Sequence, residues 1–265
     1  MKISTIILTY NRPEALELVL KSIINQSIKP DEVIVADDGS GSKTSDIITK
    51  FHKNFPVTLK HVWHEDKGFR IAAIRNKAIK ESTGDYIIFS DGDLVFHSHF
   101  FKDFKQNLCQ GKAFIGSRVF LSKQYSQQIQ MQSNFTGRVS FLSDKIEKNR
   151  LNSIRLPFIN KMMPDTNFSP KLRGGLLAVS KKDIIKVNGW NEDFTGWGKE
   201  DTEILSRMHQ IGIKFKKLKF TGITYHMWHP HESRSNVNNN EALLIQSMTK
   251  QITWCDNGLV KGDRI

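Results

Sequence analysis

The stretch Tyr86-Ile87-Ile88-Phe89-Ser90-Asp91-Gly92-Asp93 decides how this chain folds. Its apolar residues have the length and composition of a buried strand, predicted over residues 85–89. Two carboxylates then follow on a tight turn, where they can share a divalent cation. A second acidic stretch, Gly196-Trp197-Gly198-Lys199-Glu200-Asp201, places two more carboxylates at a predicted helix N-terminus. Together the two stretches predict a metal site and a separate carboxylate base.

The residues before this turn alternate between strand and helix signals. The predicted strands cover residues 3–8, 32–36, 58–63 and 85–89, and the predicted helices cover residues 11–24, 45–51 and 68–82. This alternation indicates βαβ units and a mainly parallel sheet. Ligands bind at the carboxyl ends of the strands in such sheets, so Tyr10-Asn11, Asp37-Asp38 and Asp91-Asp93 are predicted to converge at one edge.

The second half of the chain is less regular. Residues 120–170 are rich in glutamine, then in charge, and are interrupted by Pro157, Pro164 and Pro170. We interpret them as an insertion over the site. Beyond it we predict a strand over residues 173–179, helices over 181–187 and 201–211, and a strand or strand pair over 215–224. The apolar residues after about residue 240 have near-helical spacing, which favours a helix packed on the core over an amphipathic surface helix.

The composition limits the classes of protein to consider. With 265 residues, 38% of them hydrophobic and 25% charged, the chain can form a packed core. The formal net charge of +12 predicts attraction to an anionic partner, with a merely solvated basic surface as the alternative. No nucleic-acid-binding motif is recognisable, so nucleic acid is not a predicted partner and peripheral contact with an anionic membrane is favoured.

The location is predicted from what the sequence lacks. No apolar run reaches the roughly 18–20 residues of a membrane span, and no secretory signal precedes the first predicted strand. Two cysteines, Cys109 and Cys255, are too few for a disulfide framework and fit a reducing compartment. We therefore expect a cytoplasmic protein, with peripheral contact at the inner face of the cell membrane.

Five short motifs in order give the chain a family resemblance. They are Thr9-Tyr10-Asn11-Arg12, Asp37-Asp38-Gly39-Ser40, Gly68-Phe69-Arg70-Ile71-Ala72-Ala73-Ile74-Arg75-Asn76, Ser90-Asp91-Gly92-Asp93 and the Gly196 to Asp201 stretch. On these motifs the chain resembles the family 2 glycosyltransferases of the GT-A fold, over residues 1 to about 232. Its second half, with Gly189-Trp190-Asn191-Glu192, is similar to galactosyltransferase-type and chondroitin-polymerase-type domains.

The resemblance implies a fold and a division of the chain. The expected fold is α/β, a Rossmann-like three-layer core with a mixed, mainly parallel sheet. One GT-A domain is expected over residues 1–265, since no linker divides the chain. Its parts would be a nucleotide-binding half over 1–95, an acceptor-binding half over 96–232 and a C-terminal helical tail over 233–265.

The resemblance also implies a metal site. Asp93 would be the direct carboxylate ligand of Mn²⁺ or Mg²⁺, and a histidine late in the chain would complete the site. His226 is the better candidate and His229 the second, because imidazole with carboxylate fits Mn²⁺. The alternatives are an ordinary Asp-Gly turn and histidines that only cover the edge of the core.

The second acidic stretch carries the implied catalytic residues. Asp201 would be the general base that takes the proton of the acceptor hydroxyl, and Glu200 would hold hydroxyls of the donor or acceptor. Carboxylates that only stabilise a helix N-terminus are the alternative, and both roles are compatible. Trp197 is expected either to stack on the sugar or to be buried in its turn. The residues that select the sugar are expected around 173–201, with Gly174 and Gly198 among them.

The nucleotide contacts are likewise implied by the resemblance. Asp37 would accept from the uracil imide N–H, which favours UDP, while Asp38 would cap the turn. Asp91 would hold the ribose, or the metal through water. Arg75 and Asn76 are expected to support the Asp91 loop. The other expected contacts are Thr9, Tyr10, Arg12, Asp66, Arg70 and Gly92.

The predicted function is an inverting, metal-dependent transfer of a hexose or N-acetylhexosamine from a UDP-sugar to a hydroxyl of a glycan or glycolipid acceptor. The setting would be bacterial surface polysaccharide, lipopolysaccharide or capsule synthesis. One alternative is a sugar nucleotidyltransferase, but the loop after the first strand has no glycine to hold phosphates. The other is a non-catalytic nucleotide-sugar or glycan-binding module, which the intact set of acidic residues and His226 disfavours.

Overall fold

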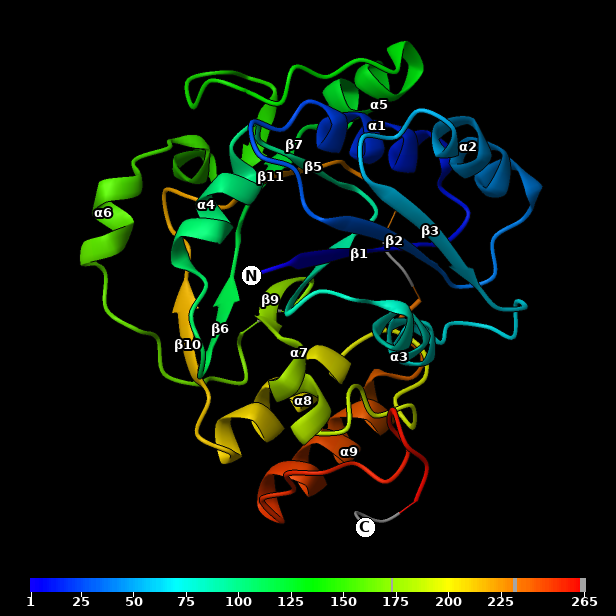
Figure 1. The fold of residues 1–265 in the computed structure, drawn as a ribbon, viewed down its shortest axis with the longest axis vertical. Helices are drawn as coiled ribbons and strands as arrows, with labels where there is room; N and C mark the ends of the chain where they lie inside the picture. The colour runs from blue at the N-terminus through cyan, green and yellow to red at the C-terminus, as the bar shows by residue number, and fades with distance from the viewer. Residues whose placement is uncertain (173, 231–232, 263–265) are drawn as a thin grey trace.

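Two sheets form the framework of the protein (Figure 1). The computed structural model describes residues 1–172, 174–230 and 233–262. The larger sheet has the strand order β10-β6-β9-β4-β1-β2-β3, and the smaller sheet has the order β5-β11-β7-β8. The larger sheet comprises β1 (Ile3–Thr9), β2 (Glu32–Asp37), β3 (Thr58–Trp63), β4 (Tyr86–Asp91), β6 (Lys112–Ile115), β9 (Leu176–Ser180) and β10 (Lys214–Lys217). The smaller sheet comprises β5 (Leu94–Phe96), β7 (Ser117–Leu121), β8 (Ile146–Lys148) and β11 (Ile223–His226).

Most pairs in the larger sheet are parallel. β1 pairs in parallel with β2 and β4, β2 with β3, and β6 with β10, while β9 runs antiparallel to both β4 and β6. The expected mixed, mainly parallel sheet is therefore confirmed. Every residue of β2 is buried, as expected of a central strand that is covered on both faces.

Helices cover both faces of the larger sheet (Figure 1). Successive residues of a strand point to opposite faces and belong to two different hydrophobic clusters. Ile7 and Val35 pack into the cluster with α1, whereas Ile6 and Ile34 pack into the cluster with α3 and α8, as the alternation of side chains along a strand requires. This is the expected three-layer core. The helices are α1 (Pro13–Ile24), α2 (Ser42–His52), α3 (Ile71–Glu81), α4 (Phe100–Asn107), α5 (Lys123–Gln132), α6 (Pro157–Met162), α7 (Lys181–Lys186), α8 (Glu200–Gln210) and α9 (Val237–Thr249), with a 3₁₀ turn η1 (Arg150–Ser153).

Several predicted boundaries differ from the observed ones. The helix predicted from residue 68 begins at Ile71, because Gly68 has a φ of +81° and Arg70 is not yet helical. The strand or strand pair predicted over 215–224 is a pair, β10 and β11, whose members lie in different sheets and are separated by a turn in which Phe220 and Gly222 have positive φ. The strand predicted from residue 173 begins at Leu176, and residue 173 itself lies outside the described residues.

Residues 120–170, interpreted above as an insertion, contain regular structure. They contribute α5, β8, η1 and α6, and Ile129 and Ile146 are buried in the core. The tail also forms a helix, because α9 packs against α8 and buries Leu244. Among the described residues, no helix has the length and apolar character needed to cross a bilayer.

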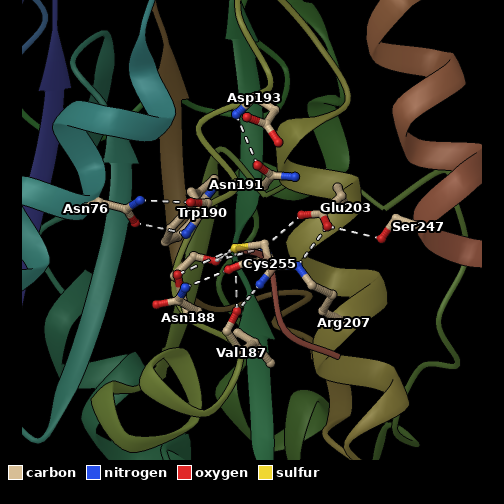
Figure 2. A network of polar contacts seen from close by, with 11 residues as sticks. Asn76, Val187, Asn188, Trp190, Asn191, Asp193, Glu203, Arg207, Ser247 and Cys255 are labelled. Carbon is tan, nitrogen blue, oxygen red and sulfur yellow. Dashed lines mark hydrogen bonds and ion pairs between the residues drawn. The ribbon is translucent and has the colours of Figure 1, made fainter. Parts of the chain in front are cut away.

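A buried ion pair within α8, between Arg207 and Glu203, connects this helix to neighbouring segments of the second half of the chain (Figure 2). The Arg207 and Glu203 side chains are 0% and 1% exposed, and two hydrogen bonds of 2.8 and 2.7 Å connect them. Arg207 also donates to the carbonyls of Val187 and Gly189, and Ser247 of α9 donates to Glu203 at 3.1 Å. The pair thus ties α8 and α9 to the turn that precedes Trp190.

We predict that Glu203→Ala lowers the free energy of unfolding by about 3–5 kcal/mol, because it leaves the Arg207 guanidinium buried without its counter-charge. Glu147→Ala removes a partner from the exposed Glu147–Lys148 pair and serves as the control, with an expected loss of about 1 kcal/mol or less. Urea denaturation of both variants provides the measurement. Equal unfolding midpoints for the two variants would contradict the prediction.

Candidate active site

Asp93, His226 and His229 come together at the junction of the two sheets. Asp93 lies between β4 and β5. His226 is the last residue of β11, which pairs antiparallel with β5, and it lies opposite Leu94 of β5. His229 Nε2 lies 3.1 Å from Asp93 Oδ2, and His226 Nε2 lies 3.7 Å from Oδ1. Each of the three side chains offers one ligand atom within 4.8 Å of the others. The structure therefore brings together all three residues that were predicted to bind metal.

These three residues fit a divalent cation. Asp93 is 7% exposed, and its Oδ1 has no hydrogen-bond partner among the described residues. A buried carboxylate oxygen without a partner is unfavourable, and a cation would satisfy it. One carboxylate with two imidazoles suits Mn²⁺. Arg12 also reaches this cluster, since its Nη1 donates to Asp93 Oδ2 at 3.1 Å.

A second cluster gathers the remaining acidic candidates around Arg75. This arginine comes from α3 and is 3% exposed. Its Nη1 lies 3.0 Å from Asp201 Oδ1 and 3.5 Å from Glu200 Oε1, and its Nη2 lies 3.8 Å from Asp91 Oδ1. One guanidinium thus contacts carboxylates from both acidic stretches of the sequence. Arg75 supports Asp91, as expected, and also the carboxylate predicted to be the base.

Trp190 packs against the guanidinium of Arg75. The Arg75 guanidinium lies 5.3 Å from the centre of the Trp190 ring, which packs edge-on against Phe89. Asn76 holds Trp190 at both backbone groups, accepting from its N–H at 2.9 Å and donating to its carbonyl at 2.8 Å (Figure 2). The expectation that Asn76 supports the Asp91 loop is therefore corrected: among the described residues, its side chain contacts the Trp190 turn and Glu192.

The electrostatics of the acidic cluster raise two pKa values. Burial raises the pKa of Glu200 to about 7; the neighbouring Asp201 adds to this and Arg75 opposes it. Burial also raises the pKa of Asp91 to about 6, against the attraction of Arg118. Glu200 Oε2 has no hydrogen-bond partner among the described residues, which is consistent with a carboxyl that carries a proton in part of the population at neutral pH.

Close backbone approach explains the glycines of this cluster. A Cβ at Gly174 would lie 2.8 Å from Asp201 Cγ, and a Cβ at Gly175 would lie 2.4 Å from Asp91 Oδ2. Gly92 is packed as tightly, with the Leu8 carbonyl oxygen 2.4 Å from its would-be Cβ. Gly174 therefore lies beside the predicted base, where it was expected.

Asp37 has the turn-capping role that was expected of Asp38. Asp37 is 1% exposed; its Oδ1 accepts from Ser40 N–H at 2.8 Å and its Oδ2 pairs with His61 at 3.0 Å. Asp37 therefore caps the turn, and neither of its oxygens is open to a uracil base. Asp38 accepts from the backbone N–H of Arg70 at 2.9 Å and contacts His64.

The other expected nucleotide contacts lie at the same edge. The Tyr10 hydroxyl donates to Asp66 at 2.8 Å, and both side chains are exposed. Thr9 is buried, and its hydroxyl has no hydrogen-bond partner among the described residues. Arg70 donates from Nη2 to the Glu65 carbonyl at 2.6 Å. Asp66 is therefore better placed than Asp37 to accept a hydrogen bond from a ligand.

Trp197 stands at the surface. Its side chain is 40% exposed, and the Arg234 guanidinium lies 5.0 Å from the centre of its ring. Gly196 and Gly198 have φ values of +71° and +105°, and Asn240 donates to the Gly198 carbonyl at 2.8 Å. The turn therefore presents the ring instead of burying it, which rules out the buried alternative.

One arginine of the site was not predicted. Arg118 of β7 reaches the acidic cluster, with Nη1 3.6 Å from Asp91 Oδ2. The available signal was a charged residue within the otherwise alternating strand Ser117–Leu121, where Val119 and Leu121 are buried. A lone arginine in a strand gives no indication of its partner, so the sequence could not assign it.

Comparison with known families agrees with this geometry. The profile of glycosyl transferase family 2 matches residues 4–164, and that of the N-terminal domain of galactosyltransferase matches residues 158–230. The first match covers more than half of the chain, so the protein belongs to glycosyl transferase family 2. The predicted family resemblance is confirmed.

Individual relatives support the same assignment. Chondroitin synthase from Escherichia coli is 25% identical over 95% of this chain, which spans 38% of that protein. Staphylococcus aureus TarS has a TM-score of 0.64 at 16% identity over 95% of this chain and 41% of its own; its fragment 1–349 in complex with UDP scores 0.61. A mannosyltransferase from Pyrobaculum calidifontis, in complex with GDP-Man and Mn²⁺, scores 0.61 at 17% identity over 94% of this chain and 63% of its own. These structures show the GT-A fold.

The raised pKa of Glu200 predicts a pH-dependent stability. Its carboxyl binds a proton more tightly in the folded state, so wild type loses this contribution to its stability as pH rises from about 4.5 through about 7. Glu200→Gln cannot ionise. We therefore expect the melting temperature of the variant to rise relative to wild type between pH 5 and pH 8, roughly, when both are measured in EDTA. A constant difference across this range would contradict the prediction.

Proposed function

We propose that this member of glycosyl transferase family 2 transfers a hexose or N-acetylhexosamine from a UDP-sugar to a hydroxyl of a glycan or glycolipid, with inversion at the anomeric carbon. The observation that carries the proposal is the placement of two clusters at one edge of the sheet. Asp93, His226 and His229 form one cluster, and Arg75 with its carboxylates forms the other. The UDP-bound and Mn²⁺-bound neighbours of the same fold support the choice of UDP and Mn²⁺.

The metal-binding residues would act on the leaving group. Asp93, His226 and His229 would hold Mn²⁺ or Mg²⁺, which when bound supplies positive charge to the donor diphosphate. Tyr10 and Asp66 would contact the nucleotide, and Asp66, unlike Asp37, has an exposed carboxylate for the uracil imide. The expected nucleotide contacts of Thr9, Arg12, Arg70, Asp91 and Gly92 remain part of the proposal.

Asp201 would be the general base. It accepts the proton of the acceptor hydroxyl while an electron pair of that oxygen forms the bond to the anomeric carbon. The bond from this carbon to the diphosphate oxygen breaks, and its electron pair leaves with UDP. Attack opposite the leaving group inverts the anomeric centre. Arg75 holds Asp201 Oδ1 at 3.0 Å and so keeps the carboxylate in one orientation.

Glu200 and Trp197 would position the sugars. With a pKa of about 7, Glu200 can both donate to and accept from sugar hydroxyls near neutral pH. The exposed ring of Trp197, next to Gly198 in the chain, offers an apolar face for sugar C–H groups. Gly174 lies beside the proposed base. The proposed setting is surface polysaccharide synthesis at the inner face of the cell membrane, supported by the chondroitin synthase relative and the net charge of +12.

A donor panel tests the proposed reaction. We expect wild type with Mn²⁺ to release UDP from at least one UDP-sugar, and to lose this activity in EDTA. With glycan-fragment or lipid-linked acceptors, Asp201→Asn should lower the transfer rate by about 10²- to 10⁴-fold, because the base can no longer accept the proton. Asp46→Asn, an exposed position on α2, is the matched control. If wild type releases UDP from none of the donors, the proposal is contradicted.

The metal site can be tested without turnover. We predict that Asp93→Asn lowers the affinity for Mn²⁺ by about 100-fold, since loss of a metal ligand should cost at least as much as loss of a residue that orients one. Electron paramagnetic resonance of free Mn²⁺ measures the affinity directly, again with Asp46→Asn as the control. Unchanged Mn²⁺ affinity in Asp93→Asn would exclude this residue as a ligand.

A further inference from the structure

Arg118 differs from the other two arginines that reach the carboxylates of the site. Arg12 donates to Asp93 at 3.1 Å, and Arg75 donates to Asp201 at 3.0 Å. Arg118 Nη1 remains 3.6 Å from Asp91 Oδ2, which is too long for a hydrogen bond. Among the described residues, its guanidinium has no hydrogen-bond acceptor, and 21% of its side chain is exposed. Its five N–H donors are therefore available to a ligand.

The backbone places Arg118 between the two clusters. β7 lies beside β11, and Phe120, two residues after Arg118, contacts the metal-site residue His226 with ring centroids 4.9 Å apart. The other end of the Arg118 side chain reaches Asp91 of the acidic cluster. Gly175 leaves room for this approach, since a Cβ there would lie 3.2 Å from Arg118 Nη1. Arg118 thus lies between the proposed metal-binding residues and the proposed base.

The acidic groups around Arg118 disfavour an anionic ligand unless a positively charged side chain contacts it. A diphosphate that enters this site approaches the carboxyl groups of Asp91, Asp93, Glu200 and Asp201, and each of them repels it when ionised. Arg12 and Arg75 each use part of their hydrogen-bonding capacity on a carboxylate of the protein. A guanidinium is also planar and binds phosphate or carboxylate through two parallel hydrogen bonds, as a lysine ammonium cannot.

We propose that Arg118 binds an anionic oxygen group of the donor, at the junction of sugar and diphosphate. This inference rests on the proposed function and extends it to a residue outside the predicted set. Two groups on a nucleotide sugar have the required chemistry: the β-phosphate that leaves with UDP, and the carboxylate of a uronic acid donor. Arg118 contacts the ligand and does not act through another residue.

Calorimetric binding in the presence of Mn²⁺ tests this proposal without relying on turnover. The ligands are UMP, UDP, a neutral UDP-hexose and a UDP-uronate, and the proteins are wild type, Arg118→Gln and Arg118→Lys. Arg138→Gln is the matched control, because Arg138 is exposed and contacts Ser98, outside both clusters. We expect Arg118→Gln to weaken the relevant ligand by about 10- to 100-fold, with a smaller loss for Arg118→Lys.

The pattern of losses distinguishes the two groups. A loss for UDP that exceeds the loss for UMP assigns Arg118 to the β-phosphate. Unchanged UDP affinity with a selective loss for the UDP-uronate assigns it to the sugar carboxylate. Wild-type affinity of Arg118→Gln for all four ligands would overturn the proposal and leave the proposed function intact. If wild type itself binds no UDP, both fail. Melting curves verify folding, and Arg118→Lys decides the question if Arg118→Gln does not fold.

Discussion

The buried guanidinium of Arg75 is the constraint on which the site depends. Transfer of a charged side chain from water into the interior is costly, and the cost is offset only when counter-charges and hydrogen bonds surround the group. Arg75 finds its counter-charges in Asp91, Glu200 and Asp201, which come from a strand end and a helix start far apart in the chain. Because the arginine must be neutralised, these carboxylates must converge. The charge balance of the interior therefore determines the arrangement of the proposed catalytic residues.

This arrangement continues into the packing beneath it. The Trp190 ring packs against the Arg75 guanidinium. Asn76 holds the backbone of Trp190, and Arg207 donates to the carbonyls of the turn that precedes it (Figure 2). Asn188 in that turn has a positive φ and donates to the carbonyls of Cys255 and Val260. The C-terminal segment thus supports the site although it lies outside it. Contacts through Trp190 and Arg75 connect this segment to the carboxylates.

The sequence predicted the elements that carry chemistry better than their pairings. The strand and turn from Tyr86 to Asp93 were predictable because an apolar run followed by Asp-Gly-Asp is a local pattern. The roles of Asp37 and Asp38 were not, because neighbouring carboxylates diverge and only the positions of His61, His64 and Arg70 decide what each one contacts. The smaller sheet also escaped prediction, since its strands are short and pair across long stretches of chain. Arg118 was not predicted because its partner, Asp91, is also distant in the sequence.

The Asp91-Gly92-Asp93 turn has a structural task that explains why the metal-binding residues and the base cluster lie side by side. It links β4 of the larger sheet directly to β5 of the smaller one. Gly92 lets the turn pass against the Leu8 carbonyl, and the Asp93 carbonyl accepts from Met227 N–H at 3.0 Å, which fixes β11 beside it. Asp91 therefore lies between Arg75 of α3 and Arg118 of β7, while Asp93 faces His226 and His229. A longer or bulkier link would separate the sheets, and with them the proposed leaving-group site from the proposed base.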